Sequence, residues 1–539
     1  MKTVKYEESG IKLRPNLSKS INHKLKTESV TVKAYTDKGV EIKVKMDVKS
    51  PDRITIKAEN ELDNVKVVVE GKVPEKINPF KVIAESSIRV LMGLKSVSVS
   101  LSDNRGTVLP GYKPNTKYIG MNDVNGVYAP GLAFVSGWQD PEFAWYAINH
   151  GWLTKDTTFN DAFRLTYSEN ITLRALYEPM PNFKVEINAI RTYSRNKDQN
   201  YRANEFGQYR TTVPVINGNY SLSIISAGSA FKSPKKVFNR FKSSRYTVAK
   251  RLFDQRDKKA LRVYEWGPNK FPTGYSELSQ EVLIPSFLSA YSQYSSSNVP
   301  LDNFPRIPMP NWQITYDGLA KLSFFKNYFR TFTLTHGYRS VYSIGAYAAN
   351  LKYDEEEDGL NWVTNSIGDF ITRRDITNVS IIEQFSPLIG LDMNWVNNLT
   401  SRFEVKTSRS LAMSFSNNQL TQTNAWEYII GGGYRFENMP LIFGSEEGQQ
   451  RTLKSDLRLR LDFSIRKNET VLHKMVEEVS ITNAGMITTS IKASADYLIS
   501  NQVTFRAFFD WGKTKPTASG PSFPQINSSF GFSLRFTMI

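Results

Sequence analysis

The last stretch of the chain, Ser528 to Ile539 (SSFGFSLRFTMI), constrains the fold more than any other segment. Its large apolar residues alternate with glycine, serine, arginine and threonine, so an extended strand would carry one apolar face and one polar face. The same alternation recurs upstream, most clearly in Asp456 to Arg466 (DLRLRLDFSIR). A chain built from many such strands is expected to form a sheet that is wet on one face only.

A membrane span in this chain would have to be a β-strand. The mean hydropathy is −0.39, and no run approaches the roughly 18 apolar residues that a membrane helix needs. Burying Arg458 and Arg460 in a dry sandwich core without partners would be costly, whereas a water-filled lumen removes that cost. We therefore predict an all-β chain, the C-terminal segment of a large transmembrane antiparallel β-barrel with long, partly helical loops, preceded by a small β domain.

The pattern divides the chain into four parts. Residues 1–26 are predicted to be a lead-in, 27–72 a small all-β extramembrane domain, 73–82 a linker and 83–539 the barrel segment, with about sixteen strands. Long loops are predicted at about 105–165, 195–218, 232–310 and 348–374. Residues 235–255 and 276–291 favour helices that cover the barrel. Counting strand directions from the C-terminus places 232–310 on the periplasmic side.

Composition excludes several kinds of site. The chain has no cysteine, which removes disulfides, thiolate nucleophiles and cysteine-ligated metals. The four histidines are scattered without ligand spacing, so no catalytic, cofactor or metal residues are predicted. The acidic run 354–358 favours a solvated loop over a calcium site, because calcium loops space their ligands and include a glycine. His150 is predicted to have a structural role, since no Gly-x-Ser-x-Gly elbow accompanies it. His336 is predicted to have one because it lies in the middle of a predicted strand.

The net charge of +17 is compatible with nucleic acid, anionic lipid headgroups or an acidic passenger as partner. Lysine and arginine are spread along the whole chain and no stacking platform emerges, so no nucleic-acid partner is predicted. Basic residues on the polar positions of predicted strands are candidate lumen-facing groups: Arg174, Arg458, Arg460, Lys492, Arg506 and Arg535. They would either favour acidic passengers or form the cross-strand charge pairs of any hydrated barrel.

Two sets of residues resemble known proteins. Ser529, Gly531, Leu534 and Phe536 resemble the C-terminal assembly signal of bacterial outer-membrane β-barrels. The long-loop motif Leu109-Pro110-Gly111-Tyr112, together with a series of longer strings in the same order, resembles the C-terminal part of the SprA/Sov family, the outer-membrane translocon of the type IX secretion system of Bacteroidota. These strings are VLIPSFLSAY (282–291), PRIPMPNWQITYDGLAKL (305–322), THGYRSVYSIGAY (335–347), EQFSPLIGLDMNW (383–395), SNNQLTQ (416–422) and FGFSLRFT (530–537).

The resemblance implies a very large single-chain barrel in the outer membrane of a Gram-negative bacterium, with a lumen that conducts proteins to the cell surface. In the family this export is linked to gliding motility. The partners it implies are outer-membrane lipids, the remainder of the barrel chain, a PorV-type shuttle protein, a periplasmic plug protein and secreted passengers. Because family members are several times longer, this chain is expected to be a fragment of the wall. The alternatives are another outer-membrane barrel, such as a nutrient-uptake receptor or surface adhesin, and an outer-membrane hydrolase.

Overall fold

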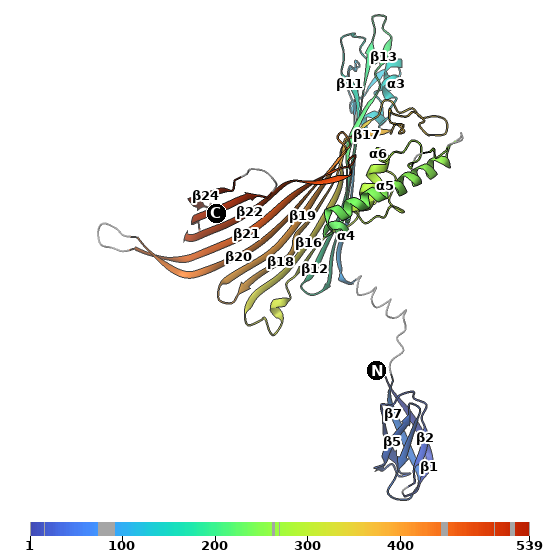
Figure 1. Ribbon diagram of the computed structural model, residues 1–539, viewed down its shortest axis with the longest axis vertical. Helices are drawn as coiled ribbons and strands as arrows, with labels where there is room; N and C mark the ends of the chain where they lie inside the picture. Colours follow the sequence, from blue (N-terminus) through green and yellow to red (C-terminus); the bar gives the residue numbers. More distant parts are fainter. Residues whose placement is uncertain are drawn as a thin grey trace. The chain divides into compact units, whose positions relative to one another are not determined.

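The structure of the protein, a computed structural model, describes residues 2–15, 17–73, 92–260, 265–268, 270–443, 451–500, 502–517 and 523–537 (Figure 1). The chain divides into two units, Met1–Leu91 and Met92–Ile539. Residues 74–82 of the predicted linker lie outside the described residues.

The first unit contains two small antiparallel sheets with strand orders β1-β7-β3-β4 and β2-β6-β5. Its strands are β1 (Lys2–Leu13), β2 (Lys19–Asn22), β3 (Val30–Tyr35), β4 (Glu41–Ile42), β5 (Lys45–Ser50), β6 (Arg53–Lys57) and β7 (Leu62–Val73). A core of isoleucine, leucine, valine and alanine side chains, including Ile11, Ile54 and Val67, fills the unit.

The prediction that residues 1–26 form a lead-in is wrong, because this segment belongs to the first unit. β1 pairs with β7 along most of its length, and Ile11 and Leu13 are buried. Register shifts between Glu8 and Leu13 break the period of two. Without that period the alternation is not visible in the sequence, and the pairing partner lies about 60 residues away.

The second unit contains one 15-stranded antiparallel sheet, close to the number of strands predicted. It comprises β8 (Leu94–Val108), β11 (Ala162–Met180), β12 (Phe183–Ala203), β13 (Tyr209–Thr211), β14 (Val215–Ser223), β15 (Asn311–Tyr316), β16 (Phe329–Ala349), β17 (Arg374–Ile376), β18 (Asn378–Trp395), β19 (Leu399–Ser414), β20 (Gln419–Phe443), β21 (Arg451–Lys474), β22 (Val479–Ser500), β23 (Val503–Pro516) and β24 (Gln525–Phe536).

The long strands follow one another in chain order, and Figure 1 shows β16 to β22 side by side. Tight turns join many of them. Asn182 and Asn398 adopt the left-handed conformation in two of these turns, which asparagine tolerates better than most residues. β8 and β24 are the two outer strands of the sheet. The predicted all-β class, with a large antiparallel sheet, long and partly helical connections and a small preceding β domain, is confirmed.

The predicted loop 195–218 is wrong for most of its length. β12 continues to Ala203, and its residues 191–198 pair with residues 215–222 of β14. Polar residues dominate both segments, so the alternation that would indicate these strands is not visible in the sequence. The connection between β8 and β11 holds β9 (Asn122–Val124), β10 (Val127–Ala129), α2 (Leu132–Val135) and α3 (Phe143–Asn149). Another connection, residues 350–373, separates β16 from β17.

The strands β14 and β15 occupy one position in the sheet, since both lie between β12 and β16. Residues 224–310, here called the helical insertion, therefore interrupt a wall strand. The insertion contains α4 (Ala227–Ala230), α5 (Pro234–Asp257) and α6 (Gln280–Tyr291). The prediction that 232–310 lies on the periplasmic side rested on a strand count that took the segments before and after it as two neighbouring strands. That count is wrong, because β14 and β15 share one position and run in the same direction.

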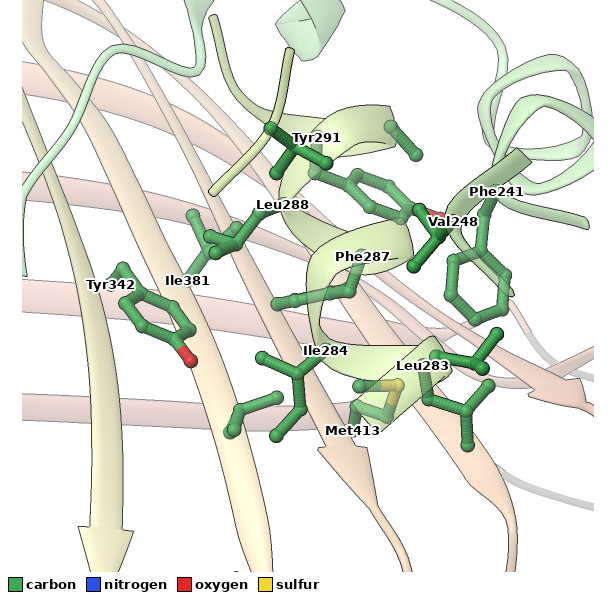
Figure 2. Packing of buried hydrophobic residues seen from close by; sticks show 14 of the residues in the cluster. Phe241, Val248, Leu283, Ile284, Phe287, Leu288, Tyr291, Tyr342, Ile381 and Met413 are labelled. Atoms are coloured by element: carbon green, nitrogen blue, oxygen red, sulfur yellow. The ribbon is translucent and has the colours of Figure 1, made fainter. Parts of the chain in front are cut away.

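The helical insertion packs on one face of the sheet through the largest apolar core of the unit. Figure 2 shows α6 residues Leu283, Ile284, Phe287 and Leu288 between α5 and the strands that carry Tyr342, Ile381 and Met413. Every α6 side chain from Val282 to Tyr291 is buried, and α5 lies against α6 through Phe241 and Val248. Among the described residues, no helix is both long enough and apolar enough to cross a membrane.

The insertion lies at one end of the strands. Arg245 of α5 pairs with Glu478, in the turn before β22, with Nη2 and Oε1 2.6 Å apart. β22 then runs away from that turn to Ser500, which pairs with Val503, and Val503 also pairs with Phe536 at the end of β24. The insertion and the end of β24 are therefore at opposite ends of the strands.

Candidate functional site

The register of the large sheet separates its side chains into two faces. Residues that are directly opposite on neighbouring strands share a face, and alternate residues of one strand point to opposite faces. Arg458 and Arg460 lie opposite Asp496 and Ser494, while Leu459 and Leu461 lie opposite Ala495 and Ala493. We call the face that carries Arg458 the polar face and the face that carries Leu459 the apolar face.

The apolar face exposes large side chains over its whole width. Phe532 of β24 and Leu101 of β8, on the two outer strands, are 63% and 67% exposed. The register joins them through exposed or half-buried apolar residues on the strands between, including Val99, Leu334, Ile389, Tyr428, Ile430, Leu461, Ile465 and Phe509. A continuous exposed apolar face of this extent requires an apolar environment.

The height of this apolar face fits a membrane. On β21 it extends from Leu457 to Ile465, which is about 27 Å along the strand. Membrane-spanning strands have about 9–11 residues, and their outward apolar band is about 25 Å tall. At the end of the strands opposite the end of β24, the helical insertion covers the same face beyond this apolar band.

The six predicted basic residues all lie on the polar face. Lys492 is opposite Asp462 on one neighbouring strand and Asp510 on the other. Arg174 of β11 has Asn188 and Ser98 as its opposite residues, far from the others in strand order. The remaining four come together around one hollow of about 280 Å³: Arg458, Arg460, Arg506 and Arg535.

This hollow also contains two carboxylates, Asp456 and Asp496. Arg506 pairs with Asp496 through two hydrogen bonds of 2.5 and 2.9 Å. Asp456 pairs with Arg435 of β20, with Nε 2.9 Å from Oδ2. Within the described part of the chain, Arg458, Arg460 and Arg535 form no such pair.

The other predicted motifs have separate locations. In β24, Ser529 and Gly531 lie on the polar face, and Leu534 and Phe536 on the apolar face. The motif Leu109-Pro110-Gly111-Tyr112 packs in the connection between β8 and β11, where Tyr112 contacts Trp152 edge to face. Gly111 has φ +70°, and a Cβ there would meet Thr154 and Phe159, so glycine is required at this turn.

The two candidate histidines make packing contacts. His150 Nδ1 is 2.8 Å from the carbonyl oxygen of Tyr146, and its ring lies against Trp152. His336 Nδ1 is 2.7 Å from the carbonyl oxygen of Leu388. In the acidic run, Asp358 accepts hydrogen bonds from Leu360 N–H and Trp362 Nε1. Within the described ranges, no group of three or more His, Asp or Glu side chains could hold a metal ion.

A buried ion pair that the sequence analysis missed joins the helical insertion to the wall. Glu383 of β18 and Arg409 of β19 are 1% and 5% exposed, with Arg409 Nη2 2.7 Å from Glu383 Oε2. Glu383 Oε1 accepts hydrogen bonds from the hydroxyls of Ser226 and Tyr338. Arg409 donates to the carbonyl oxygens of Ser229 and Ser226. The ion pair is therefore hydrogen-bonded to Ser226 at the start of α4 and to Ser229 within it.

A signal for this pair is present in the sequence. Glu383 and Arg409 have the parity of Val379, Ile381, Leu411 and Met413, so they lie on the apolar face. A charged residue at an apolar position of the alternation would lie in an apolar environment. Such a charge is too costly to bury without a partner of opposite sign. Two such charges on neighbouring strands thus predict each other, provided that the register is known.

We expect Glu383→Ala to loosen the helical insertion, because Arg409 is left buried without its carboxylate, at a cost of about 3–5 kcal/mol. The measurement is the rate at which a protease cleaves residues 224–310 of the folded protein in detergent. Asp392→Ala is the matched control, since it removes an exposed partner of Arg402 on the same strand and should change the rate little. The protease should cleave the double variant Glu383→Leu with Arg409→Met more slowly than Glu383→Ala. Equal cleavage rates of all variants would contradict the role of the ion pair in anchoring the helical insertion.

A second polar cluster lies inside the connections above the apolar face. Glu281 of α6, Arg256 of α5 and Tyr275 line one cavity of about 280 Å³. Burial raises the pKa of Glu281 to about 7, although Arg256 opposes the shift. Burial also raises the pKa of Asp369, a carboxylate that accepts hydrogen bonds from the backbone N–H and hydroxyl of Ser276. The guanidinium of Arg256 stacks on Phe370, 3.5 Å from the ring centre.

The raised pKa of Glu281 predicts that the protein loses stability as the pH rises. Since the folded pKa of about 7 exceeds the unfolded value, stability should fall between about pH 4.5 and pH 7, by up to about 3 kcal/mol. Glu281→Gln should remove this part of the dependence and be the more stable protein above pH 7. Urea unfolding in detergent, followed by tryptophan fluorescence across this pH range, measures it. The same pH dependence in the variant would contradict the assignment to Glu281.

Comparison with known proteins gives no family. No protein-family model matches the chain, and no curated protein matches it. Among solved structures, the chain is similar to OmpT, an outer membrane protein of Vibrio cholerae, in its trimer form, with 8% identity, 82% of this chain and 99% of that chain covered, and a TM-score of 0.17. A loop L8 deletion mutant of OmpT gives 8% identity, coverage of 70% and 94%, and a TM-score of 0.18. Both TM-scores are low, so neither likeness indicates a function for this chain.

Proposed function

We propose that the chain forms part of the wall of a β-barrel in the outer membrane of a Gram-negative bacterium, and that its polar face lines a pore through which proteins are exported. The observation that carries this proposal is the separation of the 15-stranded sheet into an exposed apolar face and a polar, charged face. Lipid would cover the first face, and water would fill the space beside the second.

The finer assignment is the translocon of the type IX secretion system, which the resemblance to the SprA/Sov family suggests. In this proposal the rest of the barrel chain pairs with the outer strands β8 and β24, because unpaired backbone edges cannot persist in lipid. Passengers cross the lumen, a PorV-type shuttle and a periplasmic plug control access, and no chemical reaction is involved. The bacterium would belong to the Bacteroidota, and loss of the protein would abolish export and gliding.

Single cysteines on opposite faces test the pore, because the chain has no cysteine of its own. The complete assembly would be purified from secreting cells, freed of its plug and placed in planar bilayers. Arg460→Cys lies on the polar face, and Leu461→Cys, the matched control, is the next residue on the apolar face. We expect a bulky, charged thiol reagent to lower the ionic current of Arg460→Cys alone.

Two results would contradict the proposal. The first is that the unplugged assembly carries no large current. A closed uptake receptor or an adhesin would give this result. The second is an equal effect of the reagent on both variants, which would mean that the two faces do not separate lumen from lipid.

A further inference from the structure

We propose that the hollow around Arg458, Arg460, Arg506 and Arg535 is an anion-binding site that holds an acidic, extended polypeptide segment. The inference rests on the proposed function, since it names the kind of passenger segment that the polar face would bind. It concerns binding, however, and can be tested without passage through a pore.

The charges in this hollow do not cancel. Four arginines line it with only two carboxylates, Asp456 and Asp496. Asp496 is engaged by Arg506, and Asp456 is engaged by Arg435 from the neighbouring strand. Arg458 lies opposite Asp496, but among the described residues no salt bridge is formed by Arg458, Arg460 or Arg535.

Several basic residues elsewhere on the polar face have acidic neighbours. Lys492 lies between Asp462 and Asp510. Lys406 pairs with Glu404 at 2.9 Å, and Arg402 pairs with the same carboxylate. The cross-strand charge pairs of a hydrated wall thus explain these residues, but they do not explain the excess in the hollow.

The arrangement of the guanidinium groups suits carboxylates on an extended chain. Arg458 and Arg460 are two residues apart on one strand, which places their Cα atoms about 7 Å apart. Carboxylates at alternate positions of an extended peptide have the same spacing. Arg535 lies across β22 and β23 on the far side of the hollow. Each planar guanidinium can hold a carboxylate through two parallel hydrogen bonds.

A lipid headgroup is a poorer occupant. The hollow opens on the polar face, whereas the exposed apolar side chains of the same strands point to the other face. Leu498 is the one large apolar residue among those described around the hollow, so acyl chains would have almost nothing to pack against. A soluble anion of extended shape matches this lining.

The test is binding of a short, fluorescent oligoglutamate peptide to the full chain in neutral detergent, measured by anisotropy. Arg458→Gln, Arg460→Gln and Arg535→Gln together should weaken binding by about tenfold or more, because three charge-assisted contacts are lost. The matched control removes three basic residues of the same face elsewhere, Arg174→Gln, Lys184→Gln and Arg339→Gln, and should change affinity little.

A gain of affinity separates binding from misfolding. Asp496→Asn removes the carboxylate that engages Arg506, so a fourth guanidinium becomes available and oligoglutamate should bind more tightly. A damaged fold would not produce this result. Added salt should weaken binding, as expected for a hydrated charge interaction.

Three results would overturn the proposal. One is equal affinity of the two triple variants, and another is equal binding of oligoglutamate and a neutral peptide of the same length. The third is binding of anionic phospholipid micelles, in a manner that depends on the three arginines, with no binding of oligoglutamate. If oligoglutamate binds as expected but the unplugged assembly carries no current, the proposed pore fails and the anion site stands.

Discussion

The structure depends on a register that keeps the exposed apolar stripes of neighbouring strands on the same side of the large sheet. A shift of one residue between two strands would exchange the faces, which would put Arg458 and Arg460 in lipid and Leu459 and Leu461 in water. Where the register does shift, the faces are preserved. β16 and β18 both carry irregularities near Gly337 and Pro387, yet Leu334 and Tyr342 stay on the side of Leu391 and Ile381.

The same constraint explains how the wall tolerates a strand that leaves it. Between β14 and β15 the backbone hydrogen bonds of the sheet are interrupted, and polar groups replace them. The Ser223 hydroxyl donates to the Met309 carbonyl and accepts from the Ile190 N–H, while the Asn311 side chain accepts from the Ser340 N–H. Buried polar groups at this point therefore restore the pairing that a membrane wall requires.

The sequence predicted those parts of the fold that depend on local alternation, and it failed where pairing is distant. Strands β18 to β24 are visible in the sequence because each carries a full apolar stripe. β1, the end of β12 and the single wall position of β14 and β15 are not, since few apolar residues mark them and their partners lie far away in the chain. Alternation along each strand already indicates that the basic residues lie on the face opposite the apolar stripe. Their gathering around one hollow requires the register of four strands.

Charge on the two faces follows different physical rules, and this difference gives the hollow its significance. On the apolar face a buried charge needs a partner within the protein, so Glu383 and Arg409 are paired. The Ser226 and Tyr338 hydroxyls donate to Glu383, and Arg409 donates to the Ser229 hydroxyl. On the polar face water solvates each charge, and an unpaired guanidinium carries little cost. An excess of arginine therefore costs little on that face, where it stays available to an incoming anion. The unpaired arginines of the hollow therefore lie on the face opposite the exposed apolar side chains of the same strands.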